Sequence, residues 1–271
     1  MRMKRRGHTL LKLLIILVSI GMAFGVNMLS MLIVEDEGNL GQIILADFTE
    51  MMALGLIIFI WGKFLPRQFP ATNDYRFRKP AIYQVLMVIG IALISLVGGY
   101  RLLYVFRGGD VNVTMIPIAY ESAAEFKEEM MASIHAILIA PTLEEMCFRI
   151  IPASVVQTNK KRIVVLAILA ILFAALHRNN FLAAWGDATV FIVLFIVTRN
   201  PLIPILCHAF SNLFKTLAGM VSYIGLMNVS MSDGGALIVL FSTPVTIGLV
   251  VIGAALVMPV IIHLLHKEQA A

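Results

Sequence analysis

The sequence is poor in charged residues and in cysteine. Charged side chains make up 14% of the 271 residues and hydrophobic ones make up 60%, whereas soluble proteins have about 25% and about 45–50%. This composition excludes an ordinary soluble domain and predicts an integral membrane protein with several helices. The two cysteines, Cys147 and Cys207, both lie in apolar runs. A disulfide framework is therefore not indicated, and buried thiols are expected instead.

Low-complexity segments, internal repeats and a soluble domain are also lacking, and what remains is a series of apolar runs. We expect an all-α, polytopic fold with about eight transmembrane helices, because about 20 apolar residues span the hydrocarbon core. An interfacial helix is expected within residues 116–131. Residues 1–271 are expected to form one integral membrane domain, with the catalytic helices within 130–226. The expected spans are approximately 10–34, 42–61, 82–106, 130–156, 163–182, 188–197, 202–226 and 236–265.

Positive charge is distributed unevenly over the expected loops. With eight spans, 15 of the 21 Lys and Arg residues lie on the side of the termini and 4 lie on the other side. Cytoplasmic loops carry the excess of Lys and Arg, so a multi-pass protein with both termini in the cytoplasm is predicted. The net charge of +5 is small, which favours contact with membrane lipids and gives no indication of nucleic-acid binding.

Three ionisable residues interrupt the fourth apolar run: Glu144, Glu145 and Arg149. Such groups are costly at membrane depth and by default mark a functional site. On a helix, Glu145 and Arg149 are four residues apart and share a face, whereas Glu144 points about 100° away. The spacing predicts that Arg149 neutralises Glu145 and that Glu144 is available for chemistry. A purely structural ion pair with a second glutamate at a polar helix end is the competing interpretation.

Two later apolar runs contribute further polar side chains. His177 follows Phe173 by four residues in the fifth run, and Asn212 follows His208 by four residues in the seventh. Each pair shares one face of a helix. A single histidine in such a run is more often a packing residue. Together, however, the three clusters supply a carboxylate, two imidazoles and an amide, which are the groups needed to activate water and to hold an oxyanion.

The ordered set Glu144-Glu145-x-x-x-Arg149, Phe173-x-x-x-His177 and His208-x-x-x-Asn212 resembles the CAAX protease and bacteriocin-processing family (CPBP, also called Abi) of intramembrane proteases. The resemblance covers residues 141–217. It implies an eight-helix α fold and a glutamate-dependent endopeptidase. The expected substrates are peptides or proteins, prenylated or not, cleaved at the cytoplasmic side of the membrane. The short chain, without a large soluble loop, suits a bacterial member in the plasma membrane.

The resemblance also implies a role for each motif residue. Glu144 and His177 would activate water, and His208 and Asn212 would stabilise the tetrahedral oxyanion. The pair Glu145–Arg149 would support the site. No cofactor is expected.

Other functions stay open at this stage. The family includes non-catalytic bacteriocin-immunity and scaffold proteins. A zinc-dependent membrane protease could use Glu144, His177 and His208 as ligands, although the sequence lacks His-Glu-x-x-His. A transporter is disfavoured because no inverted repeat is visible. A nucleophilic pair of Cys207 and His208 is disfavoured because adjacent helical residues diverge by about 100°.

Overall fold

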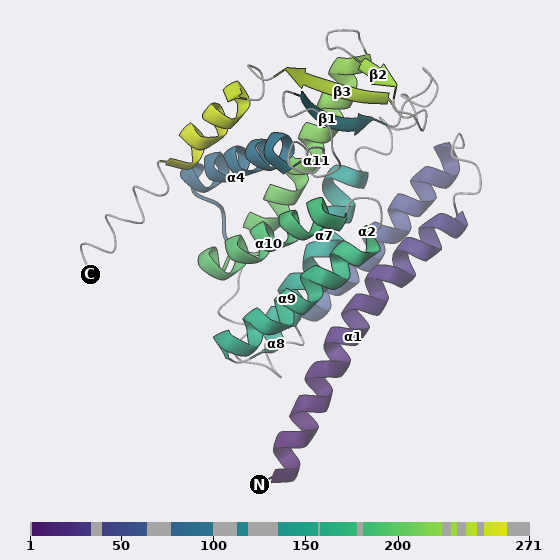
Figure 1. The fold of residues 1–271 in the computed structure, drawn as a ribbon. Helices are drawn as coiled ribbons and strands as arrows, with labels where there is room; N and C mark the ends of the chain where they lie inside the picture. Colours follow the sequence, from purple (N-terminus) through teal and green to yellow (C-terminus); the bar gives the residue numbers. More distant parts are fainter. Residues whose placement is uncertain are drawn as a thin grey trace, which may run out of the picture. The chain divides into compact units, whose positions relative to one another are not determined.

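The computed structural model describes residues 2–33, 40–63, 77–99, 113–118, 135–156, 158–177, 181–223, 229–231, 237–242 and 247–258 (Figure 1). The chain forms two compact units. Unit 1 comprises Met1–Arg78 and Leu138–Ile205, and unit 2 comprises Lys79–Ile137 and Leu206–Ala271. The described residues are mainly helical, in agreement with the expected fold class. The expected single membrane domain over residues 1–271 stays a prediction.

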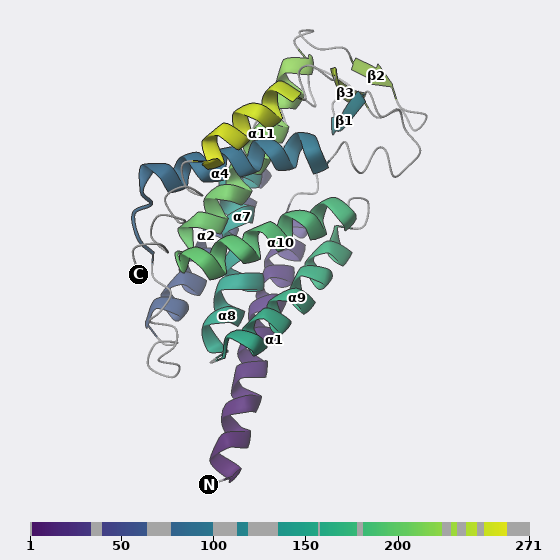
Figure 2. The ribbon, with the colours of Figure 1, turned by 60° about the vertical axis from the view of Figure 1, so that its left-hand side comes forward.

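Unit 1 is built from helices that share one apolar core. In chain order they are α1 (Arg2–Ile33), α2 (Leu40–Lys63), α7 (Ala140–Glu145), η4 (Met146–Ile150), α8 (Ile151–Val155), α9 (Asn159–Leu176) and α10 (Phe181–Thr198). Helix α1 packs beside α2, and α9 packs beside α10, as Figures 1 and 2 both show. The core between them contains Trp61, Met146, Phe148, Phe173 and Phe195.

Two π-helical segments interrupt the helical run that carries the glutamates. The π segment η3 (His135–Ile139) precedes α7, and η4 precedes α8. Each π segment ends two residues before a proline, Pro141 in α7 and Pro152 in α8. Proline cannot donate a backbone hydrogen bond, and its ring crowds the carbonyl one turn earlier. The wider π turn accommodates that defect, and π segments of this kind are frequent at functional sites.

The chain after α8 is held by an arginine from the following helix. Arg162 is buried in α9 and donates from Nε to the carbonyl oxygen of Ala153 at 3.0 Å. It also donates from Nη2 to the carbonyl oxygen of Val156 at 2.9 Å. The last carbonyls of a helix have no partner within the helix. Arg162 supplies one, and so fixes the turn between α8 and α9.

A tight turn at residues 198–201 connects α10 to α11 (Leu202–Tyr223). Arg199 has a positive φ of 52°, which the sharp change of direction requires. The Asn200 side-chain oxygen accepts from the backbone N–H groups of Leu202 and Arg78, both at 3.2 Å. The Asn200 amide nitrogen donates back to the carbonyl oxygen of Arg78 at 2.9 Å. The turn therefore also anchors the segment before α4.

Unit 2 contains α4 (Ile82–Ile94), the π segment η2 (Ser95–Gly99), most of α11, and a helix over Ile247–Met258. Helix α4 lies against the helix Ile247–Met258, drawn in yellow in Figure 2. A Cβ atom on Gly253 would lie 2.7 Å from the carbonyl oxygen of Gly90. Because only glycine lacks a Cβ atom, these two positions permit the close approach of the two backbones.

A small antiparallel sheet in unit 2 was not expected. Its order is β1 (Val113–Ile118), β3 (Leu237–Ser242), β2 (Val229–Met231), with Val113 opposite Ser242 and Val229 opposite Val239. Pro117 lies in β1, which is an edge strand and therefore tolerates a missing N–H.

The sheet corrects two sequence predictions. The expected interfacial helix over residues 116–131 begins as strand β1, and residues 119–131 lie outside the described residues. The expected helix over residues 236–265 begins as strand β3, and the helix follows only from Ile247. The stretches that form β1 and β3 are short and mostly apolar, and in such stretches periodicity cannot distinguish a strand from a buried helix.

Large apolar side chains are exposed along several helices, which is typical of a membrane protein. Two helical segments, Ile44–Lys63 and Phe181–Thr198, are long and apolar enough to cross a membrane. Shorter apolar helices cover Leu10–Val26, Ile82–Val97, Leu202–Leu217 and Ile247–Met258. The expected number of eight spans stays a prediction. Exposed apolar residues include Leu45, Phe48, Phe59, Ile163, Ile168, Trp185, Val193 and Val197.

Candidate active site

The two adjacent glutamates have different surroundings. Glu144 and Glu145 end helix α7, and Glu144 is half-buried whereas Glu145 is fully buried. Glu145 Oε1 accepts from Arg149 Nη1 at 2.5 Å. Arg149 lies in η4 and is only 1% exposed. The ion pair that the four-residue spacing predicts is thus present, and it involves the second glutamate of the two.

Aromatic rings complete the surroundings of the arginine. The guanidinium carbon of Arg149 lies 4.4 Å from the ring centroid of Phe173 in α9 and 5.4 Å from that of Phe191 in α10. A cation over an aromatic face is stabilised by the quadrupole of the ring. A buried charge is tolerated only when it is paired and well solvated by its neighbours. Glu145 and the two rings meet part of that need and bring three helical segments to one point, while Arg149 Nε and Nη2 have no hydrogen-bond partner within the described residues.

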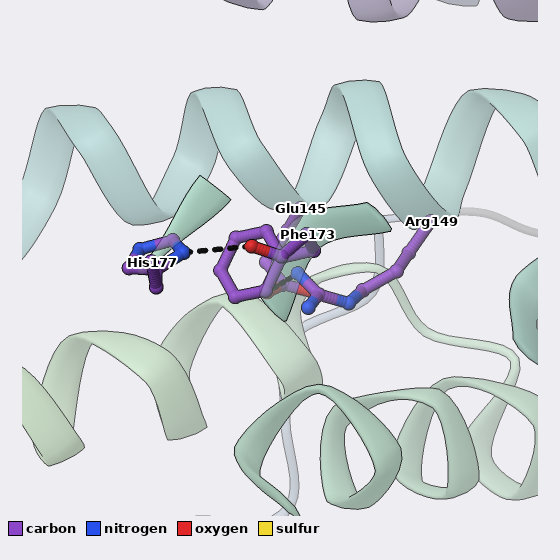
Figure 3. Close-up of polar contacts among 4 residues, drawn as sticks. All are labelled: Glu145, Arg149, Phe173 and His177. Carbon is purple, nitrogen blue, oxygen red and sulfur yellow. Dashed lines mark hydrogen bonds and ion pairs between the residues drawn. The ribbon is translucent and has the colours of Figure 1, made fainter. Parts of the chain in front are cut away.

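His177 lies at the C-terminal end of α9, where its side chain is exposed. Its Nδ1 atom is 2.9 Å from the carbonyl oxygen of Phe173, one turn earlier in the helix. A carbonyl oxygen can only accept, so Nδ1 carries the proton in this hydrogen bond, and Nε2 of the neutral ring carries a lone pair. The imidazole also lies 4.4 Å from the ring of Phe173 at an interplanar angle of 41° (Figure 3).

Helix α11 carries the two other motif residues. His208 is 8% exposed, and Asn212 one turn later is half-buried. The Asn212 amide nitrogen donates to the carbonyl oxygen of Ala136 in η3 at 2.7 Å. A side-chain amide has two N–H donors. The bond to Ala136 fixes the plane of the amide and with it the direction of the second N–H.

The motif residues therefore fall into two groups. The ion-pair cluster (Glu145, Arg149, Phe173 and His177) is brought together within unit 1, which also contains Glu144. The α11 pair (His208 and Asn212) belongs to unit 2. The convergence of the two groups on one reacting centre stays a prediction. Among the described residues of either unit, no three His, Cys, Asp or Glu side chains gather as a metal-binding group.

Comparison with known proteins finds a family that matches part of the chain. Residues 127–214 match the family model described as type II CAAX prenyl endopeptidase Rce1-like. This region is similar to the CAAX protease family. The matched region contains all six residues that the sequence analysis singled out as the site. No curated protein and no solved structure matches the chain.

The match to this family has coarse consequences for function. The family is a protease family, so a peptidase acting on peptide or protein substrates is indicated. The apolar helices agree with a membrane protein.

Phe173 is the residue whose contacts the sequence analysis did not anticipate. The motif spacing placed it on the same helical face as His177, four residues away. That spacing was the available signal for a contact between the two rings. It could not reveal the guanidinium of Arg149, because this group comes from a different helical segment.

Proposed function

We propose that the chain is a glutamate-dependent intramembrane endopeptidase. It would cleave peptide or protein substrates, prenylated ones included, at the cytoplasmic side of the membrane. The observation that carries the proposal is the family match over residues 127–214, because this region contains all three motifs in order. The different surroundings of Glu144 and Glu145 support a division of labour between these two residues.

In the proposed mechanism, Glu144 is the general base. Glu145 is buried against Arg149 and serves to compensate that charge. Glu144 is more accessible than Glu145. A general base needs this accessibility, because it must reach the proton that it removes from water. His177 orients the water molecule that Glu144 deprotonates, by accepting a hydrogen bond from it at Nε2. This atom has a lone pair when Nδ1 donates to the carbonyl oxygen of Phe173.

The chemical steps then follow for a peptide bond. Glu144 takes one proton from water while the water oxygen attacks the carbonyl carbon. The resulting oxyanion receives hydrogen bonds from an N–H of His208 and from the second N–H of Asn212. The C–N bond breaks when the proton held by Glu144 passes to the leaving nitrogen. The products are a carboxylic acid and an amine, and Glu144 returns to its starting state.

This assignment gives every motif residue a task without a metal ion. We therefore propose that the reaction needs no cofactor, and zinc held by Glu144, His177 and His208 is the alternative.

We also propose that the chain crosses the membrane eight times with both termini in the cytoplasm, and that this membrane is a bacterial plasma membrane. Reporter fusions after Lys267 and within residues 63–79 should both report the cytoplasm. A signal from the opposite side at either position would contradict the span count.

The experiment that tests the proposed activity compares wild-type protein with the Glu144→Gln variant. Both are reconstituted in lipid vesicles and supplied with a peptide library that includes prenylated C-terminal peptides. Glu144→Gln should lower kcat by about 10²–10⁴-fold, because it removes a general base. Asp187→Asn is the matched control, since Asp187 is a half-buried carboxylate on α10 outside the motifs.

Three outcomes would contradict the proposal. Cleavage that survives in Glu144→Gln would remove Glu144 from the mechanism. A membrane phenotype that persists in Glu144→Gln, in a protein without measurable cleavage, would favour the immunity or scaffold function. Equal loss in Glu144→Gln and Asp187→Asn would point to a general sensitivity of unit 1 rather than to a base.

A further inference from the structure

We propose that Phe173 is a positioning residue that holds the imidazole of His177 in the one orientation suited to bind the attacking water. This inference rests on the proposed function, because it concerns the histidine assigned there to the water. Phe173 acts through its ring, which contacts the imidazole, and through its carbonyl group, which accepts from Nδ1. The first contact depends on the side chain and can be tested by substitution.

His177 needs such a support because of where it lies. Its side chain is exposed at the end of α9, beyond the last helical residue Leu176. An exposed side chain normally exchanges among staggered rotamers, and holding one of them costs conformational entropy. Among the described residues, Phe173 provides both the hydrogen bond and the ring contact of His177. One residue therefore sets both the tautomer and the tilt of the imidazole.

Phe173 is itself held rigidly. Its side chain is 3% exposed, and its ring meets Phe148 edge to face at a centroid distance of 5.5 Å. The Arg149 guanidinium lies 4.4 Å from the same ring. Figure 3 shows the phenyl ring between the imidazole of His177 and the guanidinium of Arg149. A buried aromatic ring has only two side-chain torsions, so these contacts leave it little freedom.

The ion pair gains a second task from this arrangement. Glu145 holds Arg149, Arg149 lies over Phe173, and Phe173 contacts His177. The buried ion pair is thus connected to the exposed imidazole by contacts through the ring of Phe173. A cation over one aromatic ring fixes that ring more firmly than apolar packing alone. This explains why a histidine at a helix end can be oriented without a carboxylate partner of its own in the proposed mechanism.

Phe191 provides a matched control for a purely structural role. It is 1% exposed and lies over the same guanidinium at 5.4 Å, but it comes from α10. In the described contacts it has no ring contact with His177. Loss of either phenylalanine ring should therefore disturb Arg149 and the core. Only the loss of the Phe173 ring should release the imidazole.

The kinetic experiment compares Phe173→Leu with Phe191→Leu, each purified and reconstituted at equal amounts of folded protein. Both variants should lose thermal stability to a similar extent. Phe173→Leu should lower kcat by about 10–100-fold more than Phe191→Leu, because a small misplacement of a catalytic group has effects of this size. The KM should change little in both. Phe173→Tyr keeps the ring and should retain most of the wild-type kcat.

Equal losses of kcat in Phe173→Leu and Phe191→Leu would overturn the inference, since core packing would then explain both. The same holds if Phe173→Tyr is as impaired as Phe173→Leu while remaining folded. If Phe173→Leu does not fold, Phe173→Met against Phe191→Met gives the same comparison, because methionine is closer in volume and flexible.

A spectroscopic measurement separates this inference from the proposed function. Nitrogen NMR of protein labelled at histidine should show the Nδ1–H tautomer for neutral His177. The signal of His177 is identified because it disappears in the His177→Gln variant. In Phe173→Leu this signal should broaden or shift toward a mixture of tautomers. An unchanged signal would refute positioning by the Phe173 ring. Full cleavage by Glu144→Gln in parallel would instead refute the proposed function, whatever the NMR result.

Discussion

The ion-pair cluster and the α11 pair hold their polar side chains in opposite ways. In the cluster, Glu145 and Arg149 are almost fully buried charges that are compensated by each other and by aromatic rings. In the α11 pair, the neutral amide of Asn212 is anchored by one backbone carbonyl at 2.7 Å. The first arrangement depends on side chains from three helical segments, and the second depends on the course of the main chain.

The difference has consequences for stability and for activity. Removing one partner of a buried ion pair leaves an uncompensated charge, which is strongly destabilising. Removing a neutral side chain that bonds to the backbone costs far less. We therefore expect substitutions of Glu145 or Arg149 to act first on folding. Substitutions in the α11 pair should act first on the rate of the reaction.

The largest expected effect is that of Glu145→Gln. This change leaves the buried cation of Arg149 without its carboxylate and should lower the free energy of unfolding by about 3–5 kcal/mol. Thermal unfolding in detergent measures the loss. The double variant Glu145→Gln/Arg149→Met removes both charges and should recover much of the stability. A Glu145→Gln protein as stable as wild type would contradict the expectation that the ion pair of Glu145 and Arg149 stabilises the fold.

The second largest effect is expected from Asn212→Ala, and it should be an effect on the catalytic rate. Loss of one oxyanion donor should lower kcat by about 10²–10³-fold, while the free energy of unfolding should change by only about 0.5–1.5 kcal/mol. Asn200→Ala is the control, because the Asn200 amide also donates to a backbone carbonyl, that of Arg78, but lies outside the motifs. Comparable kcat values for the two variants would show that Asn212 is merely structural.

A smaller effect is expected from Ser19→Ala in α1. The Ser19 hydroxyl is 2.8 Å from the carbonyl oxygen of Ile16 in its own helix and also 3.1 Å from the carbonyl oxygen of Cys147, in the π segment that carries Arg149. Such bonds between membrane helices contribute about 0.6 kcal/mol on average, so a loss of about this size is expected in thermal unfolding. Thr49→Ala is the control, because the Thr49 hydroxyl bonds within its own helix, to Leu45. A loss of several kcal/mol in Ser19→Ala would mean that α1 is a major support of the ion-pair cluster.

The smallest expected effect is that of metal removal. If Glu144, His177, His208 and Asn212 act as proposed, strong chelators should leave the cleavage rate unchanged, and purified active protein should contain substoichiometric zinc. Elemental analysis and a chelation series measure both. Stoichiometric zinc, together with activity that is lost on chelation and restored by zinc, would instead indicate that Glu144, His177 and His208 bind one metal ion.

Much of the helical organisation could be predicted from the sequence. The helices α1, α2, α9 and α11 lie close to expected apolar runs. Helix α10 begins at Phe181, seven residues before the expected span 188–197 and inside the expected span 163–182. Long apolar runs leave few alternatives to a helix, because backbone groups in lipid must be paired within the segment. The prediction was wrong at residues 237–242, where a short β-branched and apolar run forms a strand instead. The partner strand β1 lies more than a hundred residues earlier in the chain, which local periodicity cannot reveal.

By itself, the sequence determined which groups can meet along one helix. Glu145 and Arg149 are four residues apart, as are Phe173 and His177, and helical geometry brings each pair together. Only the tertiary structure decided that the two pairs join, with Arg149 over the ring of Phe173 and Arg162 capping the end of α8. These contacts connect separate helical segments, and their geometry follows from how the apolar faces pack. Spacing along the chain carries no information on that packing, and so the aromatic link between the buried ion pair and His177 emerged only from the folded protein.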